Sequence, residues 1–186
     1  MDNYSKNPKR KSIRLKGYDY SQSGLYFITI CVQNRECLFG KIENGIMILN
    51  ELGNIANNFW IEIPEHFPMI EIHEHIIMPN HLHGIIEIVG TRRGVSLPNP
   101  DGSSHVVSPN EHQRQFSIPI PGSISTIINQ YKSSVKRWCN KNGHEYFKWQ
   151  SRFHDHIIRS EDDYYNISNY IINNPAKWQE DKYYGK

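Results

Sequence analysis

The chain has 186 residues, of which 38% are hydrophobic and 22% are charged, and this balance excludes the disordered and fibrous classes of protein. The length predicts one domain over residues 1–186, because domains have roughly 100–200 residues, and no apolar run approaches the roughly 18–20 residues that cross a bilayer. Three cysteines without C-x-x-C spacing exclude a disulfide framework, and together with the lack of an apolar leader they predict a cytoplasmic protein.

Basic side chains gather in the first 20 residues, although the net charge of the whole chain is only +2. Tyrosines are interleaved with them, a combination typical of segments that contact the phosphates and unstacked bases of a nucleic acid. A solvated terminus without a partner has the same composition, so this alternative stays open. The candidate DNA contacts in this segment are Lys9, Arg10, Lys11 and Arg14.

The first element predicted is a strand at residues 25–33, where β-branched and aromatic residues follow a glycine. Residues 37–49 repeat this pattern more weakly around Asn44 and Gly45, a pair typical of the two-residue turn of a β-hairpin. We expect this hairpin to be an appendage of the main sheet.

A helix is predicted from Asn50, its N-cap, to about Ile63, because Pro64 stops it there. Its apolar residues at helical spacing are Leu52, Ile55, Phe59 and Ile63. We expect this stripe to pack on a sheet. Two further strands are predicted at about 69–78 and 82–89, where apolar residues alternate with other residues.

Residues 91–122 hold five prolines and three glycines without periodicity, which predicts a long inserted loop. A second helix is predicted at about 124–141, and its exposed face is basic. This face adds candidate DNA contacts, namely Lys132, Lys136 and Arg137. A short strand near 152–158 follows, and then a third helix that begins near Ser160 and ends before Pro175.

The predicted order is therefore strand, hairpin, helix, two strands, helix, strand and helix. Helices interleaved with mainly antiparallel strands predict an α+β fold in which the helices pack on one sheet. The simplest fold of this kind is a ferredoxin-like sandwich, extended here by a β-hairpin and a long inserted loop.

Two histidines at the start of a predicted strand are the best candidates for a metal site. His81 and His83 are two positions apart, so both imidazoles project from one face of the strand and can share an ion. A third ligand must come from elsewhere, and two ordinary surface histidines are the alternative. The same spacing recurs in His73 and His75, which lie near Glu71, and in His154 and His156. We rank the former pair lower because it lacks the preceding Pro-Asn turn, and the latter pair is either exposed or a phosphate contact.

The last helix carries a second pair of chemical interest. Tyr170 and Asn174 are four positions apart and therefore share one face of this helix. An asparagine oxygen can complete a site with two imidazoles, and a tyrosine hydroxyl one turn away can attack a phosphodiester that the same ion polarises. In the alternative, Tyr170 is only the edge of the apolar stripe of this helix.

Residues 76–86, which read IIMPNHLHGII, and residues 169–175, which read NYIINNP, resemble the IS200-like transposase family of HUH endonucleases. Within that family they are most similar to the REP-associated tyrosine transposases. Smaller similarities, such as RLKGYDY at residues 14–20, extend the resemblance over nearly the whole chain.

The resemblance implies a ferredoxin-like domain that binds single-stranded DNA with a hairpin or inverted repeat and cuts it in DNA transposition. It makes Tyr170 the catalytic nucleophile, which forms a 5′-phosphotyrosine intermediate. It also makes His81, His83 and Asn174 the ligands of a divalent metal, Mg²⁺ or Mn²⁺. Two imidazoles and an amide oxygen are softer ligands than Mg²⁺ prefers, so the ligand type favours Mn²⁺.

Several alternatives stay open beside the resemblance. Trp149 and Arg152 are candidate DNA contacts, but Trp149 serves equally well as a core residue. Tyr164 and Tyr165 are rivals of Tyr170 for the role of nucleophile. Family members act as homodimers with exchanged helices or alone, so both states are open. The competing functions are a domesticated DNA- or RNA-binding protein that no longer cuts, and a metalloenzyme in which water attacks.

Overall fold

The computed structural model describes residues 18–90 and 122–184 of the chain. Its elements are β1 (Gly24–Cys31), the 3₁₀ helix η1 (Gln33–Arg35), β2 (Gly40–Glu43), β3 (Ile46–Leu49), α1 (Glu51–Ile61), α2 (Ile63–His66), β4 (Ile70–Met78), β5 (His81–Ile88), α4 (Ile124–Lys141), β6 (His154–Ile158), α5 (Glu161–Asn173) and the 3₁₀ helix η2 (Pro175–Glu180). This order confirms the predicted succession of strands and helices, to which the structure adds α2, η1 and η2.

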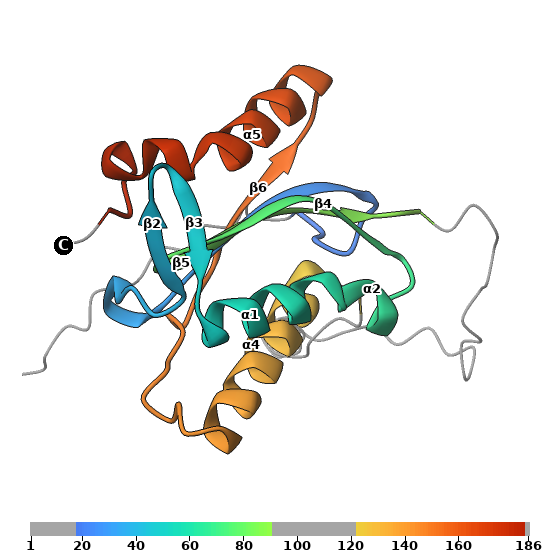
Figure 1. Cartoon of the computed structure of the whole chain (residues 1–186). Coiled ribbons are helices and arrows are strands. Elements are labelled where there is room, and N and C mark those ends of the chain that lie inside the picture. Colours follow the sequence, from blue (N-terminus) through green and yellow to red (C-terminus); the bar gives the residue numbers. More distant parts are fainter. Residues whose placement is uncertain (1–17, 91–121, 185–186) are drawn as a thin grey trace, which may run out of the picture.

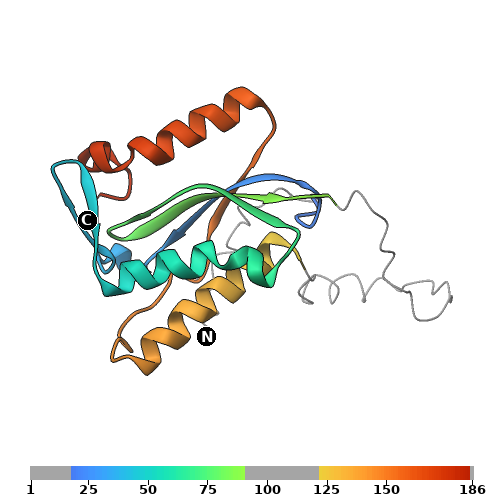
Figure 2. The ribbon, with the colours of Figure 1, turned by 45° about the vertical axis from the view of Figure 1, so that its right-hand side comes forward.

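Four strands form one sheet in the order β4-β5-β1-β6, and every neighbouring pair is antiparallel. The helices α1 and α4 lie side by side on one face of this sheet, and α5 lies over the other face (Figures 1 and 2). Two helices on one face of a four-stranded antiparallel sheet of this topology are the ferredoxin-like arrangement. The predicted α+β class is therefore confirmed, and α5 is the addition that covers the second face.

The central strand β1 explains why helices cover both faces of the sheet. Tyr26, Ile28 and Ile30 are fully buried and belong to the core under α1 and α4. Phe27 points to the opposite face, where it packs in a second cluster with Ile171 of α5. Because successive side chains of a strand alternate between the two faces, the continuous apolar run of β1 supplies both clusters.

The helices α1 and α4 begin at the predicted residues, each with a side chain that caps the first turn. Asn50 Oδ1 accepts a hydrogen bond from the Gly53 amide at 2.9 Å, and Ser123 Oγ accepts one from the Thr126 amide at 3.4 Å. Pro64 lies in the first turn of the short α2, so it begins a new helix as well as ending α1.

The buried side of α1 matches the predicted stripe in part, since Leu52 and, at the start of α2, Ile63 are buried as predicted. Leu52, Ala56 and Trp60 are buried, whereas Ile55 and Phe59 are only partly buried. The buried residues and the partly buried residues both recur at helical spacing, and they lie on neighbouring parts of the helix surface. The periodicity alone does not distinguish them, and the large indole of Trp60 takes the central place in the core.

The strands β2 and β3 form a separate two-stranded sheet, which confirms the predicted hairpin appendage. Asn44 and Gly45 at its turn have φ angles of 51° and 75°. These left-handed conformations are those of a type I′ turn, which Asn-Gly favours. The hairpin stands beside the C-terminal end of α5 (Figure 1).

The helix α5 also begins and ends as predicted. Ser160 caps it, since its Oγ accepts a hydrogen bond from the Asp163 amide at 3.2 Å. The acidic residues of its first turn, which suit the positive end of the helix dipole, are Glu161, Asp162 and Asp163. Pro175 follows the helix and begins η2.

Two segments discussed above lie largely outside the described residues. One is the basic N-terminal segment with Lys9, Arg10, Lys11 and Arg14, and the other is the loop predicted at 91–122. All three cysteines fall within the described ranges and are free thiols. A search of the described helices found none that is long and apolar enough to span a membrane.

Gly84 of β5 lies against Trp60 of α1, so a substitution of Gly84 tests how tightly the sheet packs on this helix. A Cβ atom at residue 84 would lie 2.5 Å from Cζ2 of Trp60. Gly84→Ala is therefore expected to lower the free energy of unfolding, measured by chemical denaturation, by about 1–3 kcal/mol. This cost should shrink in a Trp60→Leu background, and an equal cost in both backgrounds would show that the indole is not the cause.

Candidate functional site

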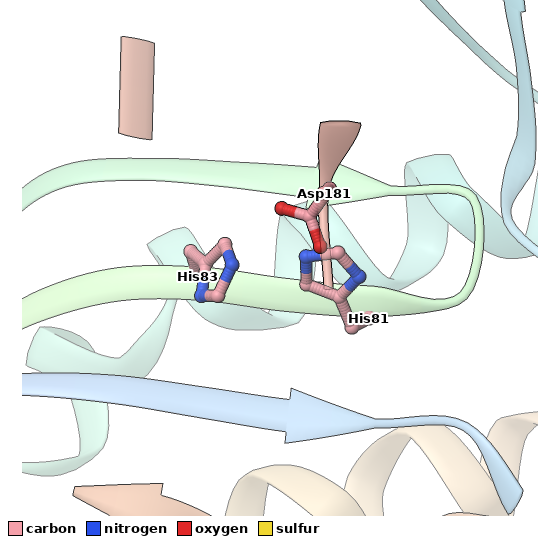
Figure 3. Close-up of side chains that lie close together, drawn as sticks. All are labelled: His81, His83 and Asp181. Carbon is pink, nitrogen blue, oxygen red and sulfur yellow. The ribbon is translucent and has the colours of Figure 1, made fainter. Parts of the chain in front are cut away.

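His81 and His83 lie at the start of β5 and are both fully buried on the face of the sheet that carries α5. Their ring centroids are 4.4 Å apart. In the sheet His81 pairs with Cys31 of β1 and His83 pairs with Thr29. The predicted placement of both imidazoles on one face of the strand is thus observed, in the interior rather than on the surface (Figure 3).

Asn80 determines which nitrogen of His81 is free. Its amide nitrogen donates to the backbone carbonyls of Arg35 at 3.1 Å and of Tyr183 at 2.8 Å. Its amide oxygen is therefore the atom that lies 2.8 Å from Nδ1 of His81, and this nitrogen must donate. The other nitrogen, Nε2, consequently carries a lone pair, and it is buried without a partner among the described residues.

His83 is held by two hydroxyl groups. Its Nδ1 lies 2.8 Å from Oγ1 of Thr29, and its Nε2 lies 3.2 Å from the hydroxyl of Tyr170. A threonine hydroxyl can both donate and accept. Thr29 therefore supports either tautomer, so His83 can offer Nε2 as a donor to Tyr170 or as a lone pair to an ion.

Tyr170 and Asn174 reach the two histidines from α5 and its C-cap, as their spacing predicted. Both contact one carboxylate oxygen, since the Tyr170 hydroxyl donates to Oδ2 of Asp181 at 3.1 Å and the Asn174 amide nitrogen donates to it at 2.7 Å. The Oδ1 atom of Asn174 is buried and has no partner in the described part of the chain. The phenol of Tyr170 is 40% exposed, so a substrate can reach it.

Asp181 is a residue of this site that sequence reasoning missed. It follows η2, in a segment without periodicity, and only its acidic character could have drawn attention to it. Its carboxylate is directed toward the two imidazoles (Figure 3), and one ligand atom from each of His81, His83 and Asp181 lies within 4.8 Å of the others. The site is thus built from β5, α5 and the segment that follows η2.

Burial governs the protonation of the site. Desolvation lowers the pKa of His81 and of His83, so both imidazoles are neutral at pH 7. Desolvation and, next, the negative charge of Asp181 raise the pKa of Tyr170, so its hydroxyl keeps its proton. Neutral imidazole is the form that binds a metal ion.

The pair His73 and His75 does not share a face, contrary to the prediction from its spacing. The pairing of β4 with β5 shifts register between Ile72 and His75, as in a β-bulge, and this breaks the alternation of side chains. Nε2 of His75 lies 3.1 Å from Oδ1 of Asn57 in α1. His73 lies on the opposite face and contacts the Tyr164 hydroxyl at 3.1 Å.

His73 forms a second group with Glu71 and Glu87, whose ligand atoms lie within 4.8 Å of one another. Its Nε2 is 2.9 Å from Glu87, so both of its ring nitrogens have partners. In this group no imidazole nitrogen lacks a partner, whereas Nε2 of His81 does, so this group is the weaker metal candidate.

The exposed pair His154 and His156 lines a groove of about 380 Å³. Its remaining lining residues are Phe27, Thr29, Arg35, Asp155, Lys182 and Tyr183. Thr29, which lines this groove, also hydrogen-bonds to His83 through its hydroxyl. His156 also contacts Asp163 of α5 at 2.9 Å.

The candidate DNA contacts after residue 122 lie apart from the two histidines. Lys132 and Lys136 donate to the backbone carbonyls of Gln150 at 2.6 Å and of Glu145 at 2.9 Å. With Arg137 they line an open hollow on α4, a helix that packs on the opposite face of the sheet from His83.

Trp149 and Arg152, the two candidate DNA contacts that follow α4, differ in exposure. The indole of Trp149 packs against Phe39 and Phe147 of the core, with centroid distances of 5.5 and 4.9 Å. Arg152 is exposed. The packing of Trp149 agrees with its alternative role as a core residue.

The tyrosines of α5 differ in their surroundings. The Tyr164 hydroxyl donates to Glu74 at 2.9 Å, and the Tyr165 side chain is 61% exposed. Of these three tyrosines, Tyr170 is the one whose hydroxyl hydrogen-bonds to His83.

No protein-family model matches the chain. An uncharacterised protein of Haemophilus influenzae is 44% identical over 179 residues, which are 94% of this chain and 93% of that protein. A second H. influenzae protein, named as a REP-associated tyrosine transposase, is 27% identical over 165 residues, which are 86% of this chain and 74% of that protein. The chain is therefore similar in sequence to a protein named as a REP-associated tyrosine transposase.

The fold of the chain also occurs in a solved structure. A solved structure of a REP-associated tyrosine transposase bound to a REP hairpin aligns with a TM-score of 0.56 and 22% identity. The alignment covers 89% of this chain and 74% of that one. The two proteins therefore share the α+β architecture described above.

The two buried imidazoles make the stability of the chain dependent on pH. Their pKa in the folded chain lies below the ordinary value of 6.5, so below that pH the unfolded chain binds protons that the folded chain excludes. With a chelator present, the free energy of unfolding should hold above about pH 6.5 and fall below it, with a slope approaching about 1.4 kcal/mol per pH unit for each histidine.

Urea unfolding at several pH values measures this slope. His81→Gln should have a shallower slope than the wild type, and His66→Ala, which changes an exposed histidine, should keep the wild-type slope. Equal slopes for His81→Gln and the wild type would contradict the assignment of the pH dependence to the site.

Proposed function

We propose that the chain is a metal-dependent nickase and strand transferase for single-stranded DNA, acting in DNA transposition with Tyr170 as its nucleophile. The observation that carries this proposal is the position of the Tyr170 hydroxyl, 3.2 Å from Nε2 of His83 and hydrogen-bonded to Asp181. Its partial exposure leaves the nucleophile open to a strand. The sequence similarity to a protein named as a REP-associated tyrosine transposase supports the same reaction class.

The residues of the site fit a divalent cation. Nε2 of His81 and Oδ1 of Asn174 are buried acceptors without partners in the described ranges, and such atoms are costly unless a ligand uses them. With Nε2 of His83 they form the proposed ligand set for Mn²⁺ or Mg²⁺. A bound ion would polarise the scissile phosphate and offset the charge that develops on it.

The groups of the chain supply the rest of the reaction. The Tyr170 oxygen forms a bond to the phosphorus while the bond from phosphorus to the 3′ oxygen breaks, which leaves a 5′-phosphotyrosine and a 3′-hydroxyl. The phenol proton moves toward Oδ2 of Asp181, the atom to which it is already hydrogen-bonded, and the leaving 3′ oxygen takes a proton from water. Because the phosphodiester is conserved in the intermediate, a second 3′-hydroxyl can reverse the step and rejoin strands.

A hairpin-bearing single strand is the proposed substrate. The solved relative is bound to a REP hairpin, and in this chain the groove beside His154 and His156 is lined in part by Thr29, which hydrogen-bonds to His83. Arg35 and Lys182 on this groove suit a phosphate backbone. The basic N-terminal residues, the cations of α4, Trp149 and Arg152 remain predicted DNA contacts.

The tyrosine mechanism predicts a covalent adduct. When the protein is incubated with labelled single-stranded hairpin DNA and Mn²⁺, we expect a species that survives denaturing electrophoresis. Tyr170→Phe removes the attacking oxygen and should abolish it, whereas Tyr165→Phe, a matched change on the same helix, should retain it. Cleavage without an adduct would favour attack by water, and binding without cleavage would favour a domesticated binding protein.

The metal role predicts that cleavage and DNA binding separate. His81→Ala removes a proposed ligand that lies in the interior, so cleavage should fall by about 100-fold or more while the affinity for hairpin DNA stays within about threefold. Gel-shift titration and a cleavage time course measure the two effects, with His66→Ala as the control. An equal loss of binding and cleavage would instead indicate a folding defect or a direct DNA contact.

A further inference from the structure

We propose that Asp181 is a ligand of the same divalent ion and that its carboxylate gives the site its preference for Mn²⁺ or Mg²⁺. This inference rests on the proposed function and extends its ligand set of two histidines and one asparagine. It assigns a metal-binding role to the segment that follows η2, to which the sequence motifs gave no role.

The distances support one shared ion. The ligand atoms of His81, His83 and Asp181 lie within 4.8 Å of one another, and the carboxylate is directed at both imidazoles (Figure 3). Atoms that bind one ion at about 2.1–2.3 Å lie at most about 4.5 Å apart. The three groups are therefore near enough for small side-chain shifts to bring them onto one cation.

The carboxylate has capacity for an ion beyond its present contacts. An ionised carboxylate offers about four acceptor positions. Three donors use them here, since the Tyr170 hydroxyl and the Asn174 amide nitrogen contact Oδ2, and the Tyr183 amide donates to Oδ1 at 2.6 Å. The remaining position is available to a cation that the neighbouring imidazoles also bind.

The chain holds Asp181 in place through its neighbours. The Tyr183 ring is 5% exposed and lies 4.5 Å from the His81 ring, and the Tyr183 carbonyl accepts from Asn80. Arg35 donates to the carbonyl of Lys182 at 3.1 Å. The residue that orients His81 thus also anchors the segment with Asp181, so little ordering is needed when an ion binds.

Ligand chemistry explains what the carboxylate adds. Imidazoles suit zinc and copper, whereas carboxylate oxygens suit magnesium and manganese. Two imidazoles and an amide are all neutral, so Asp181 would be the only negatively charged ligand in the proposed set. It would therefore raise the affinity for hard divalent ions more than the affinity for Zn²⁺.

Metal binding without DNA tests this role. Mn²⁺ and Zn²⁺ affinities are measured by calorimetry for the wild type, for Asp181→Asn and for Glu180→Gln, a matched change at the exposed neighbouring residue. We expect Asp181→Asn to weaken Mn²⁺ binding by about 30-fold or more. The loss of Zn²⁺ affinity should be at least about tenfold smaller, that is, about threefold when Mn²⁺ binding falls about 30-fold. Glu180→Gln should bind both ions as the wild type does.

The comparison of two ions keeps the test valid if the variant is less well folded. A folding defect weakens both ions alike, so an equal loss would overturn the proposal, as would unchanged Mn²⁺ binding by Asp181→Asn. If that variant binds Mn²⁺ normally while the wild type forms the covalent adduct, only the role of Asp181 fails. If the wild type neither binds Mn²⁺ nor forms the adduct, the proposed function fails as well.

Discussion

The lone pair of His81 Nε2 is the feature on which the rest of the site depends. It is buried without a partner among the described residues, and an unsatisfied buried acceptor costs about 1–3 kcal/mol. Asn80 enforces this arrangement, because its amide nitrogen is used by two carbonyls and its oxygen must take Nδ1 of His81. A cation that binds Nε2 would recover this cost, so folding prepares the site for a ligand.

The two faces of the sheet have separate tasks. One face packs under α1 and α4 and holds the larger core, while the other carries α5 and both site histidines. The ferredoxin-like layer positions His81 and His83, and the added α5 brings Tyr170 and Asn174 over them. The segment after η2 closes the arrangement with Asp181. The proposed site thus lies where α5 covers one face of the sheet and the segment after η2 adds a carboxylate.

Local periodicity explains which parts of this molecule the sequence could predict. His81 and His83 on a strand, and Tyr170 and Asn174 on a helix, keep their predicted faces because both elements are regular. His73 and His75 do not, because an irregularity in β4 shifts the register by an amount that no spacing reveals. The position of Asp181 is set by tertiary contacts of Tyr183 and Asn80, so the irregular segment gave no signal for it in the sequence.

We infer that the chain keeps the lone pairs of His81 and His83 for one divalent cation beside Tyr170. Crystals of the protein soaked in Mn²⁺, with data collected near the manganese absorption edge, provide the test. We expect an anomalous peak at about 2.2 Å from Nε2 of both histidines, with Tyr170 adjacent. A Mn²⁺ peak at the group of Glu71, His73 and Glu87, with none between His81 and His83, would contradict it.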